Sequence, residues 1–286
     1  MNKRLKCRQA LVVFTQKVLA QRRTSDKYIV QSMRRRNIIS ASEQVTDNDL
    51  FILDDVTAFG INYPAELIER LCVCNETTLL SAEELATQLA SILPPLPAAT
   101  LSGGGVITYT LLKRAGYKTP LEEIASVERT YREGIPECRT QTGIERTDVL
   151  LIDDILASGQ TLYALLEGKT IPLAAFLLAS TNVSKGNKGY RIREKSTLPS
   201  VEQLYCAKLV NGTQVNGCNK KPAILSLRYL LTKAIDNEDY KTNYLSKKFG
   251  GIEPAKRIAE LIRGIDREPI EILRRDPMQF IQRYGG

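Results

Sequence analysis

Apolar residues follow two different spacings along the chain, and each spacing predicts a kind of element. Short segments typical of strands, most of them largely apolar, occupy 50–55, 98–101, 124–130, 149–152, 172–178 and 203–210. Apolar residues three or four positions apart, as in helices, occupy 65–72, 81–93, 106–115 and the stretch that starts at 161. Because strands and helices alternate, the pattern predicts an α/β fold with a mostly parallel sheet and helices on both faces.

The two ends of the chain are patterned as helices without strands. Residues 9–22 and 24–36 predict two short helices whose outline is similar to a helix-turn-helix. Near the other end, helical spacing is found at 222–235, 254–265 and 269–284. We therefore predict a basic helical arm at 1–45, an α/β domain at 46–215, and a helical cap or oligomerisation element at 216–286.

Charge is distributed unevenly over the 286 residues. The chain has 40 Lys and Arg against 32 Asp and Glu, a net charge of +8. Residues 1–36 hold eleven basic residues and one acid, so they carry +10 and the remainder carries −2. Two interpretations of the arm stay open: a solvated helical pair packed on the main domain, or a contact with nucleic acid through residues 3–36.

The composition excludes several classes of protein. The chain has no histidine, which excludes a Ser-His-Asp triad, a Cys-His pair and a His-ligated metal. Its six cysteines form no C-x-x-C pair, so we expect reduced thiols and a cytoplasmic location. The longest apolar run, 171–179, is far shorter than the roughly 20 residues of a membrane span, so we expect no membrane partner.

The strongest motif is an apolar strand that ends in two acids. Residues 149–152 are apolar, Asp153 and Asp154 follow them, and a loop of mostly small residues then opens a helix. Ligands of open α/β sheets bind at the carboxyl ends of strands, and a loop at a helix start presents backbone N–H groups to a phosphate. Adjacent carboxylates would repel a bare phosphate but suit sugar hydroxyls or a magnesium ion. The predicted phosphate loop consists of Ala157, Ser158, Gly159, Gln160 and Thr161.

This segment resembles the phosphoribosyl-pyrophosphate (PRPP) loop of the type I phosphoribosyltransferases. In that family the paired acids hold the ribose 2′ and 3′ hydroxyls, and the loop binds the 5′-phosphate. The resemblance implies a type I phosphoribosyltransferase-like fold in which Asp153 and Asp154 are catalytic residues and hold Mg²⁺. It also implies PRPP as the donor substrate, a nitrogen base as the acceptor and a homodimer, because family members are commonly dimers.

A second segment, 98–106, fits the same family about fifty residues upstream. It is an apolar run, a glycine turn and a helix start, and it stands where these enzymes keep their pyrophosphate loop. A glycine turn on its own more often marks a plain tight turn. In combination with the first motif, the resemblance implies that the donor's pyrophosphate is bound by Ser102, Gly103, Gly104 and Gly105.

Between the two motifs, the family has a strand with a basic residue near its end and then a loop that closes over the reaction. Arg129 resembles the basic residue that reaches pyrophosphate. The polar, unpatterned segment 135–146 stands where the closing loop is expected, and Arg132 and Arg139 could assist from that region. For each arginine, an ordinary surface residue is the alternative.

The acceptor is less well defined by the sequence. Family members that act on 6-oxopurines carry an Asp at the third position after the paired acids, where this chain has Ala157. The run around the acids is closer to adenine-type and orotate-type members. Glu128 or Glu133 could then act on the acceptor, and specificity would come from the flanking segments 37–75 and 181–286.

Three functions are compatible with these motifs. The first is a phosphoribosyltransferase that ribosylates a nucleobase or a similar nitrogen acceptor and releases pyrophosphate. The second is a PRPP-sensing, nucleic-acid-binding regulator with the same fold, similar to the bacterial purine repressor, and the basic arm has a suitable position for this. The third is a nucleotide-modifying effector of a bacterial defence cassette, which the unfamiliar flanks would fit.

Residues 50–60 repeat the outline of the PRPP loop. An apolar strand leads to Asp54 and Asp55, and the segment ends in Gly60. Phe59 is bulky where the loop needs a small residue, and Asn62 replaces the final hydroxyl. A coincidental strand and turn, or a degenerate nucleotide site, would both explain this repeat.

Overall fold

The computed structural model describes much of the chain but not all of it. The described residues are 38–42, 45–72, 76–132, 135–157, 159–166, 171–180, 201–212, 214–215, 218–219, 223–238 and 240–285. The helices predicted at 9–22 and 24–36, and the predicted phosphate-loop residue Ser158, lie outside them. The boundaries predicted between an arm, an α/β domain and a C-terminal cap stay predictions.

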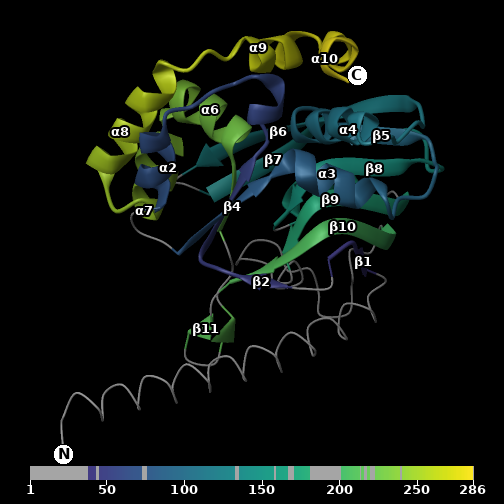
Figure 1. The fold of residues 1–286 in the computed structure, drawn as a ribbon, viewed down its shortest axis with the longest axis horizontal. Helices are drawn as coiled ribbons and strands as arrows, with labels where there is room; N and C mark the ends of the chain where they lie inside the picture. Colours follow the sequence, from purple (N-terminus) through teal and green to yellow (C-terminus); the bar gives the residue numbers. More distant parts are fainter. Residues whose placement is uncertain are drawn as a thin grey trace, which may run out of the picture.

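In the described part of the chain, the main sheet has eight strands and is almost entirely parallel (Figure 1). Its order is β1-β10-β9-β8-β5-β6-β7, with β2 (Thr46–Asp47) also paired to β10, and β7 is antiparallel to β6. Because β5, β6 and β8 are parallel to one another, their carboxyl ends meet at one edge. The bounds are β1 (Ile38–Ser40), β5 (Ala98–Leu101), β6 (Leu121–Arg132), β7 (Ile135–Thr142), β8 (Leu150–Leu156), β9 (Ile171–Ser180) and β10 (Val201–Asn211).

Both faces of the main sheet are covered, because side chains of a strand alternate between faces. On β8, Leu150 and Ile152 belong to one buried core, which includes the helices α3 (Ala82–Ala90) and α4 (Gly104–Arg114). Leu151 belongs to the other core, together with residues of the short helix α5 (Gln160–Leu165). The predicted α/β fold, a mostly parallel sheet flanked by helices, is confirmed.

Beside the main sheet, the described residues form a second, three-stranded parallel sheet of order β13-β3-β4. Its hydrophobic core joins Leu50, Ile52 and Leu225 of two of the strands with buried residues of the helices around them. The strands are β3 (Leu50–Asp54), β4 (Thr77–Ser81) and β13 (Ala223–Ser226). The helices are α2 (Ala65–Cys72), α6 (Leu227–Asp236), the π-helical segment η2 (Tyr240–Leu245), α7 (Ser246–Lys248) and α8 (Ile252–Arg263).

Three of the predicted elements differ in the structure. The helix predicted at 222–235 begins only at Leu227, because the preceding four residues form strand β13 beside β3, and Ser226 caps the helix by accepting a hydrogen bond from the N–H of Tyr229. The predicted closing loop at 135–146 is in large part strand β7, since its polar residues pair along β6 in an antiparallel hairpin.

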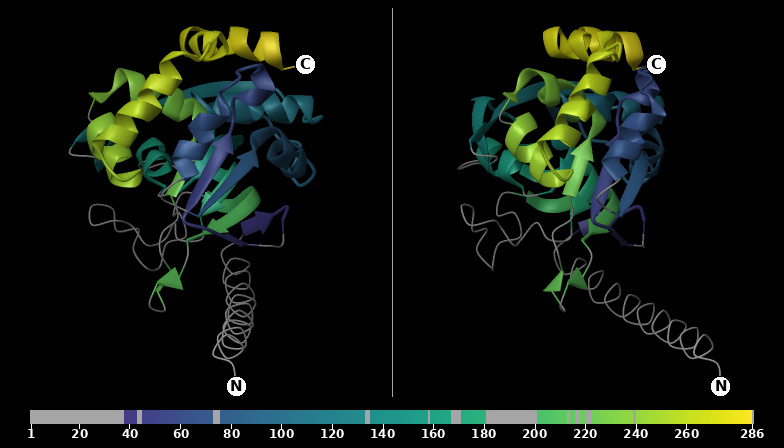
Figure 2. Two further views of the ribbon diagram at one scale, coloured as in Figure 1. Left: turned by 60° about the vertical axis from the view of Figure 1, so that its left-hand side comes forward. Right: turned by 90° about the vertical axis from the view of Figure 1, so that its left-hand side faces the viewer.

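The last helix predicted, 269–284, is two helices. Asp276 has an extended backbone and caps α10 (Pro277–Tyr284), so α9 (Glu268–Arg275) ends before it. Both helices lie across the top of the molecule in the two views of Figure 2. Phe280 of α10 packs on Phe59, with ring centroids 4.9 Å apart, which joins the tail to the segment after β3.

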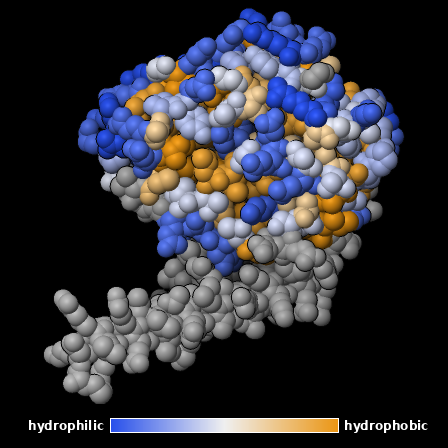
Figure 3. Space-filling view, in the orientation of Figure 1, coloured by the Kyte–Doolittle hydropathy of each residue, from blue (hydrophilic) through white to orange (hydrophobic). Residues whose placement is uncertain are grey.

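The outer faces of the C-terminal helices are hydrophilic. In Figure 3 hydrophilic residues cover the top and left of the molecule, where α8, α9 and α10 lie, and hydrophobic residues gather nearer the middle. Among the described residues, no helix has the length and apolar character needed to cross a membrane.

Candidate active site

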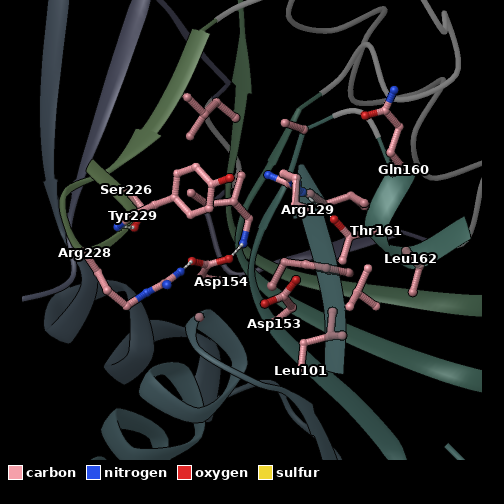
Figure 4. A pocket seen from close by; sticks show the side chains of 18 of the residues that line it. Leu101, Arg129, Asp153, Asp154, Gln160, Thr161, Leu162, Ser226, Arg228 and Tyr229 are labelled. Atoms are coloured by element: carbon pink, nitrogen blue, oxygen red, sulfur yellow. Dashed lines mark hydrogen bonds and ion pairs between the residues drawn. The ribbon is translucent and has the colours of Figure 1, made fainter. Parts of the chain in front are cut away.

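The paired acids of β8 lie at the floor of a cavity of about 200 Å³ (Figure 4). Val149 to Ile152 are fully buried and fix the strand between its neighbours, which holds the next two residues at the sheet edge. Asp153 and Asp154 are 9% and 8% exposed and both line the cavity. Two carboxylates are thus held side by side in a nearly dry environment that opens onto a ligand-sized space.

The glycine turn after β5 fits directly against this acid pair. Gly103 has a φ of +84°, which favours glycine. A Cβ on Gly104 would lie 2.2 Å from the Cγ of Asp154, and a Cβ on Gly105 would lie 2.5 Å from the carbonyl oxygen of Ile152. The predicted pyrophosphate turn and the predicted acid pair are therefore brought together, and Ser102 and Gly104 line the cavity.

The predicted phosphate loop forms another wall of the cavity. Ala157, Gly159, Gln160 and Thr161 line it, and Gly159 has the left-handed φ of +75°. Helix α5 begins at Gln160, as the motif predicted to within one residue. The loop and the glycine turn thus lie on the same cavity, with the acid pair contributing its floor.

Arg129 of β6 reaches the predicted phosphate loop. Its Nη2 donates a hydrogen bond to the hydroxyl of Thr161, and its guanidinium lies over the ring of Tyr229, 5.7 Å from the centroid. Glu128, one position earlier, is exposed, does not line the cavity and lies 3.4 Å from the amide of Gln141, which donates to it. Arg139 on β7 is also exposed. Of Arg129, Glu128 and Arg139, it is Arg129 that lines the cavity.

The second sheet supplies a wall whose individual residues were not predicted, although they lie in the flanking segment 181–286. Ser226, Arg228 and Tyr229 come from the junction of β13 and α6, and Tyr240 and Tyr244 come from η2. The Tyr240 and Tyr244 rings are stacked with centroids 4.9 Å apart. The cavity therefore lies between the two sheets, with an aromatic side that belongs to the second.

Arg228 links the acid pair to the repeat of the motif at 50–60. Its Nη2 donates to Oδ2 of Asp154 at 3.2 Å, and its Nε lies 3.5 Å from Oδ2 of Asp55. The backbone N–H of Arg228 donates to Asp55 Oδ1 at 2.8 Å, and the Ser226 hydroxyl donates to Asp55 Oδ2 at 2.6 Å. The pair Asp54-Asp55 was a sequence signal for the residue that holds Arg228.

The structure favours the strand-and-turn interpretation of that repeat. Asp54 accepts hydrogen bonds from the N–H and the hydroxyl of Thr57 and from the hydroxyl of Tyr63, so its carboxylate closes its own turn. Burial and the Asp54 carboxylate raise the pKa of Tyr63 to about 12. Phe59, too bulky for a phosphate loop, is buried in the core against α10. Asp55 lies against Arg228.

Burial dominates the electrostatics of the acids. It raises the pKa of Asp153 well above its ordinary value, and the adjacent Asp154 carboxylate raises it further. Burial also raises the pKa of Asp55 to about 6, against the lowering effect of Arg228. For Arg228, burial works to lower the pKa, but the carboxylates of Asp154 and Asp55 outweigh it, so the guanidinium stays charged.

The raised pKa of Asp55 predicts a pH-dependent stability. The folded protein binds a proton at Asp55 more tightly than the unfolded chain does, so this stabilisation is complete below the ordinary pKa of 3.8 and is lost as the pH rises through about 6. At 1.36 kcal/mol per pKa unit, the loss amounts to about 3 kcal/mol. Urea unfolding across this range should show a loss about 3 kcal/mol larger in the wild type than in Asp55→Asn, which keeps the pH dependence of the other buried acid, Asp153. Parallel pH profiles of the two proteins would contradict it.

The donor set around the cavity suits a cation that keeps most of its water. No group of three or more Asp, Glu, His or Cys residues that could hold a metal occurs in the part of the chain the structure describes. The two adjacent carboxylates, Asp153 and Asp154, meet the lesser demand of Mg²⁺, which commonly takes one or two carboxylates together with substrate phosphates. The residues present therefore fit a magnesium ion that arrives with a phosphorylated substrate.

Comparisons with known proteins give partial likeness in fold. No family model matches the sequence, and no curated protein matches it. A hypothetical protein from Neisseria gonorrhoeae with bound ppGpp is similar at a TM-score of 0.35 and 17% identity, over 63% of this chain and 91% of that one. A purine phosphoribosyltransferase from Pyrococcus horikoshii is similar at a TM-score of 0.30 and 16% identity, over 51% of this chain and 84% of that one. A hypoxanthine phosphoribosyltransferase from Staphylococcus aureus is similar at a TM-score of 0.27 and 22% identity, over 50% of this chain and 76% of that one. At these TM-scores the likeness carries no argument about reaction or ligand.

Proposed function

We propose that this protein is a phosphoribosyltransferase that uses PRPP and Mg²⁺ to ribosylate a nitrogen base, with release of pyrophosphate. One observation carries the proposal: the acid pair of β8, the glycine turn after β5 and the described residues of the loop 157–161 surround a single cavity. A sugar that carries phosphates on two sides needs this combination of hydroxyl acceptors between two phosphate-binding turns.

Each part of the cavity has a role in this proposal. Asp153 and Asp154 accept hydrogen bonds from the ribose hydroxyls and are the residues that would hold Mg²⁺, which supplies neutralisation of pyrophosphate charge. The backbone of the loop 157–161 and the hydroxyl of Thr161 bind the 5′-phosphate, and Arg129 adds a positive charge there. Catalysis in such a site consists of positioning and charge stabilisation, so the lack of histidine is no obstacle.

The aromatic wall supports a planar acceptor. Tyr229, Tyr240 and Tyr244 line the side of the cavity that belongs to the second sheet, and a flat heterocycle stacks well on such rings. Ala157 leaves no carboxylate at the position where 6-oxopurine enzymes carry one. We therefore propose an acceptor that does not need a proton removed at that position.

The direct test is release of pyrophosphate by the full chain with PRPP, MgCl₂ and a panel of purine, pyrimidine and pyridine bases. We expect release with at least one base, and PRPP binding by calorimetry. Asp148→Asn is the matched control for the acid-pair variants Asp153→Asn and Asp154→Asn, because Asp148 is an exposed carboxylate that pairs with Arg146 away from the cavity. PRPP binding without release for any base would favour the sensor over the enzyme, and absence of PRPP binding would reject both.

The basic arm is a separate proposal that rests on sequence alone. Eleven basic residues in 1–36 can contact several phosphates of a duplex, and each such contact steepens the salt dependence of binding. We expect deletion of residues 1–36 to remove salt-sensitive duplex binding and to leave PRPP affinity unchanged. Duplex binding that survives the deletion would contradict a nucleic-acid role for the arm.

The homodimer is likewise a proposal, to be checked by light scattering.

A further inference from the structure

The guanidinium of Arg228 lies at the glycine turn. Its Nη1 is 3.0 Å, and its Cζ 3.5 Å, from the position that a Cβ would take on Gly103. Its Nη2 meets Asp154 and its Nε faces Asp55, so two of its three nitrogens face carboxylates. The third, Nη1, makes no hydrogen bond to any residue that the structure describes, and the residue lines the cavity. An arginine has five N–H donors, which leaves some for a ligand.

Asp55 fixes this arginine from behind. It is fully buried and accepts from the Ser226 hydroxyl and from the backbone N–H of Arg228, so it binds both the start of α6 and the side chain that leaves it. Only 14% of the Arg228 side chain is exposed. A guanidinium with so little freedom is preorganised, and little entropy is lost when it binds an anion.

The two arginines of the cavity lie at different ends of it. Arg129 and Arg228 are the basic residues among the described ones that line the cavity. Arg129 donates to Thr161 in the phosphate loop, whereas Arg228 lies beside Gly103 in the glycine turn. Because residues 37–286 carry a net charge of −2, a polyanionic donor must be bound by placed cations and not by bulk charge.

We propose that Arg228 binds the pyrophosphate of the donor, that Asp55 is its positioning residue, and that Arg129 serves the 5′-phosphate end. This rests on the proposed function and assigns its pyrophosphate cation to the second sheet. The repeat at 50–60 is then part of the donor site through Asp55 and is not a site of its own. On binding, Arg228 keeps its contact with Asp55 and turns donors toward the pyrophosphate oxygens.

Calorimetry of the full chain with three ligands, in the presence of MgCl₂, tests the assignment. The ligands are inorganic pyrophosphate, ribose 5-phosphate and PRPP. For Arg228→Gln we expect pyrophosphate and PRPP affinity to fall about 10- to 100-fold, with ribose 5-phosphate changed less than about threefold. Arg129→Gln should show the reverse pattern for the first two ligands. Arg228→Lys, which keeps the charge, should restore part of the pyrophosphate affinity.

Asp55 is tested by a double-mutant cycle. Asp55→Asn alone should weaken pyrophosphate binding, but in the Arg228→Gln background it should cause no further loss, because it acts through that arginine. Should Asp55→Asn fail to fold, Ser226→Ala takes its place, since it removes one of the anchoring hydrogen bonds. Three results in Arg228→Gln or the cycle would overturn the assignment: equal losses for ribose 5-phosphate and pyrophosphate, an unchanged pyrophosphate affinity, or additive losses. Pyrophosphate binding that is undetectable in the wild type would overturn it as well. Failure of the proposed function would give a different result, namely that the wild type binds neither ribose 5-phosphate nor PRPP.

Discussion

Asp153→Asn is expected to reduce pyrophosphate release by roughly 10²–10³-fold or more while it makes the protein more stable. The carboxylate is nearly buried, and burial and the neighbouring Asp154 raise its pKa, so the charged form is costly in the folded state. The amide has almost the same shape and carries no charge, so the cost of burying a charge disappears, while the proposed acceptor for a sugar hydroxyl is weakened. Opposite changes in activity and stability are typical of a residue kept for function.

Two measurements check this prediction. Thermal unfolding at pH 8 should give a higher melting temperature for the variant than for the wild type, by roughly 2–4 °C for each kcal/mol relieved. The difference in melting temperature should become smaller at acidic pH, where the Asp153 carboxyl of the wild type is protonated and therefore also uncharged. Asp154→Asn serves as the comparison: it loses activity too, but it weakens the ion pair of Arg228, so it should melt lower. A wild-type-like rate for Asp153→Asn would remove this residue from the reaction.

The acid pair and the glycine turn could be predicted because their signals are local. Four apolar residues before Asp153 specify a buried strand, and parallel strands bring their carboxyl ends together, so the two motifs had to meet if the sheet was parallel. Gly104 makes the point concretely, since its lack of a side chain leaves room for the Asp154 carboxylate. The sequence order of the motifs thus carried their arrangement in space.

Arg228 could not be predicted because its place depends on pairing between distant segments. It lies 173 residues after Asp55 and joins the site only because β13 pairs with β3, and the helical spacing of 222–235 concealed that strand. Strand β7 was not predicted for a related reason: a polar strand of a hairpin pairs through its backbone and shows no apolar pattern in the sequence. Glu128 shows the limit of carrying a role over by position, because strand alternation leaves it exposed beside Arg129.

Gly104→Ala is expected to disable the donor site and destabilise the protein by about 3 kcal/mol or more. A Cβ at this position would lie 2.2 Å from both Cγ and Oδ2 of Asp154, far inside van der Waals contact. The carboxylate cannot simply rotate away, because it is held by the N–H of Ile155 at 2.7 Å and by Arg228 at 3.2 Å. Either the buried ion pair breaks or the turn after β5 moves off β8, and in both cases Asp154 and Arg228 leave the arrangement that we propose binds the donor.

Gly264→Ala is the matched control for this change. The nearest atom to its added Cβ is 3.8 Å away, and its backbone is in the ordinary right-handed region, so we expect a change in unfolding free energy within about 0.5 kcal/mol. Calorimetry with PRPP and urea unfolding would be run on both variants. Gly105→Ala separates the loss of stability from the loss of donor binding, because its Cβ would clash with the backbone carbonyl of Ile152 and not with the Asp154 carboxylate. If Gly104→Ala lost stability but bound PRPP as tightly as the wild type, the contact between the glycine turn and Asp154 would be a packing feature, and the donor would have to bind elsewhere in the cavity.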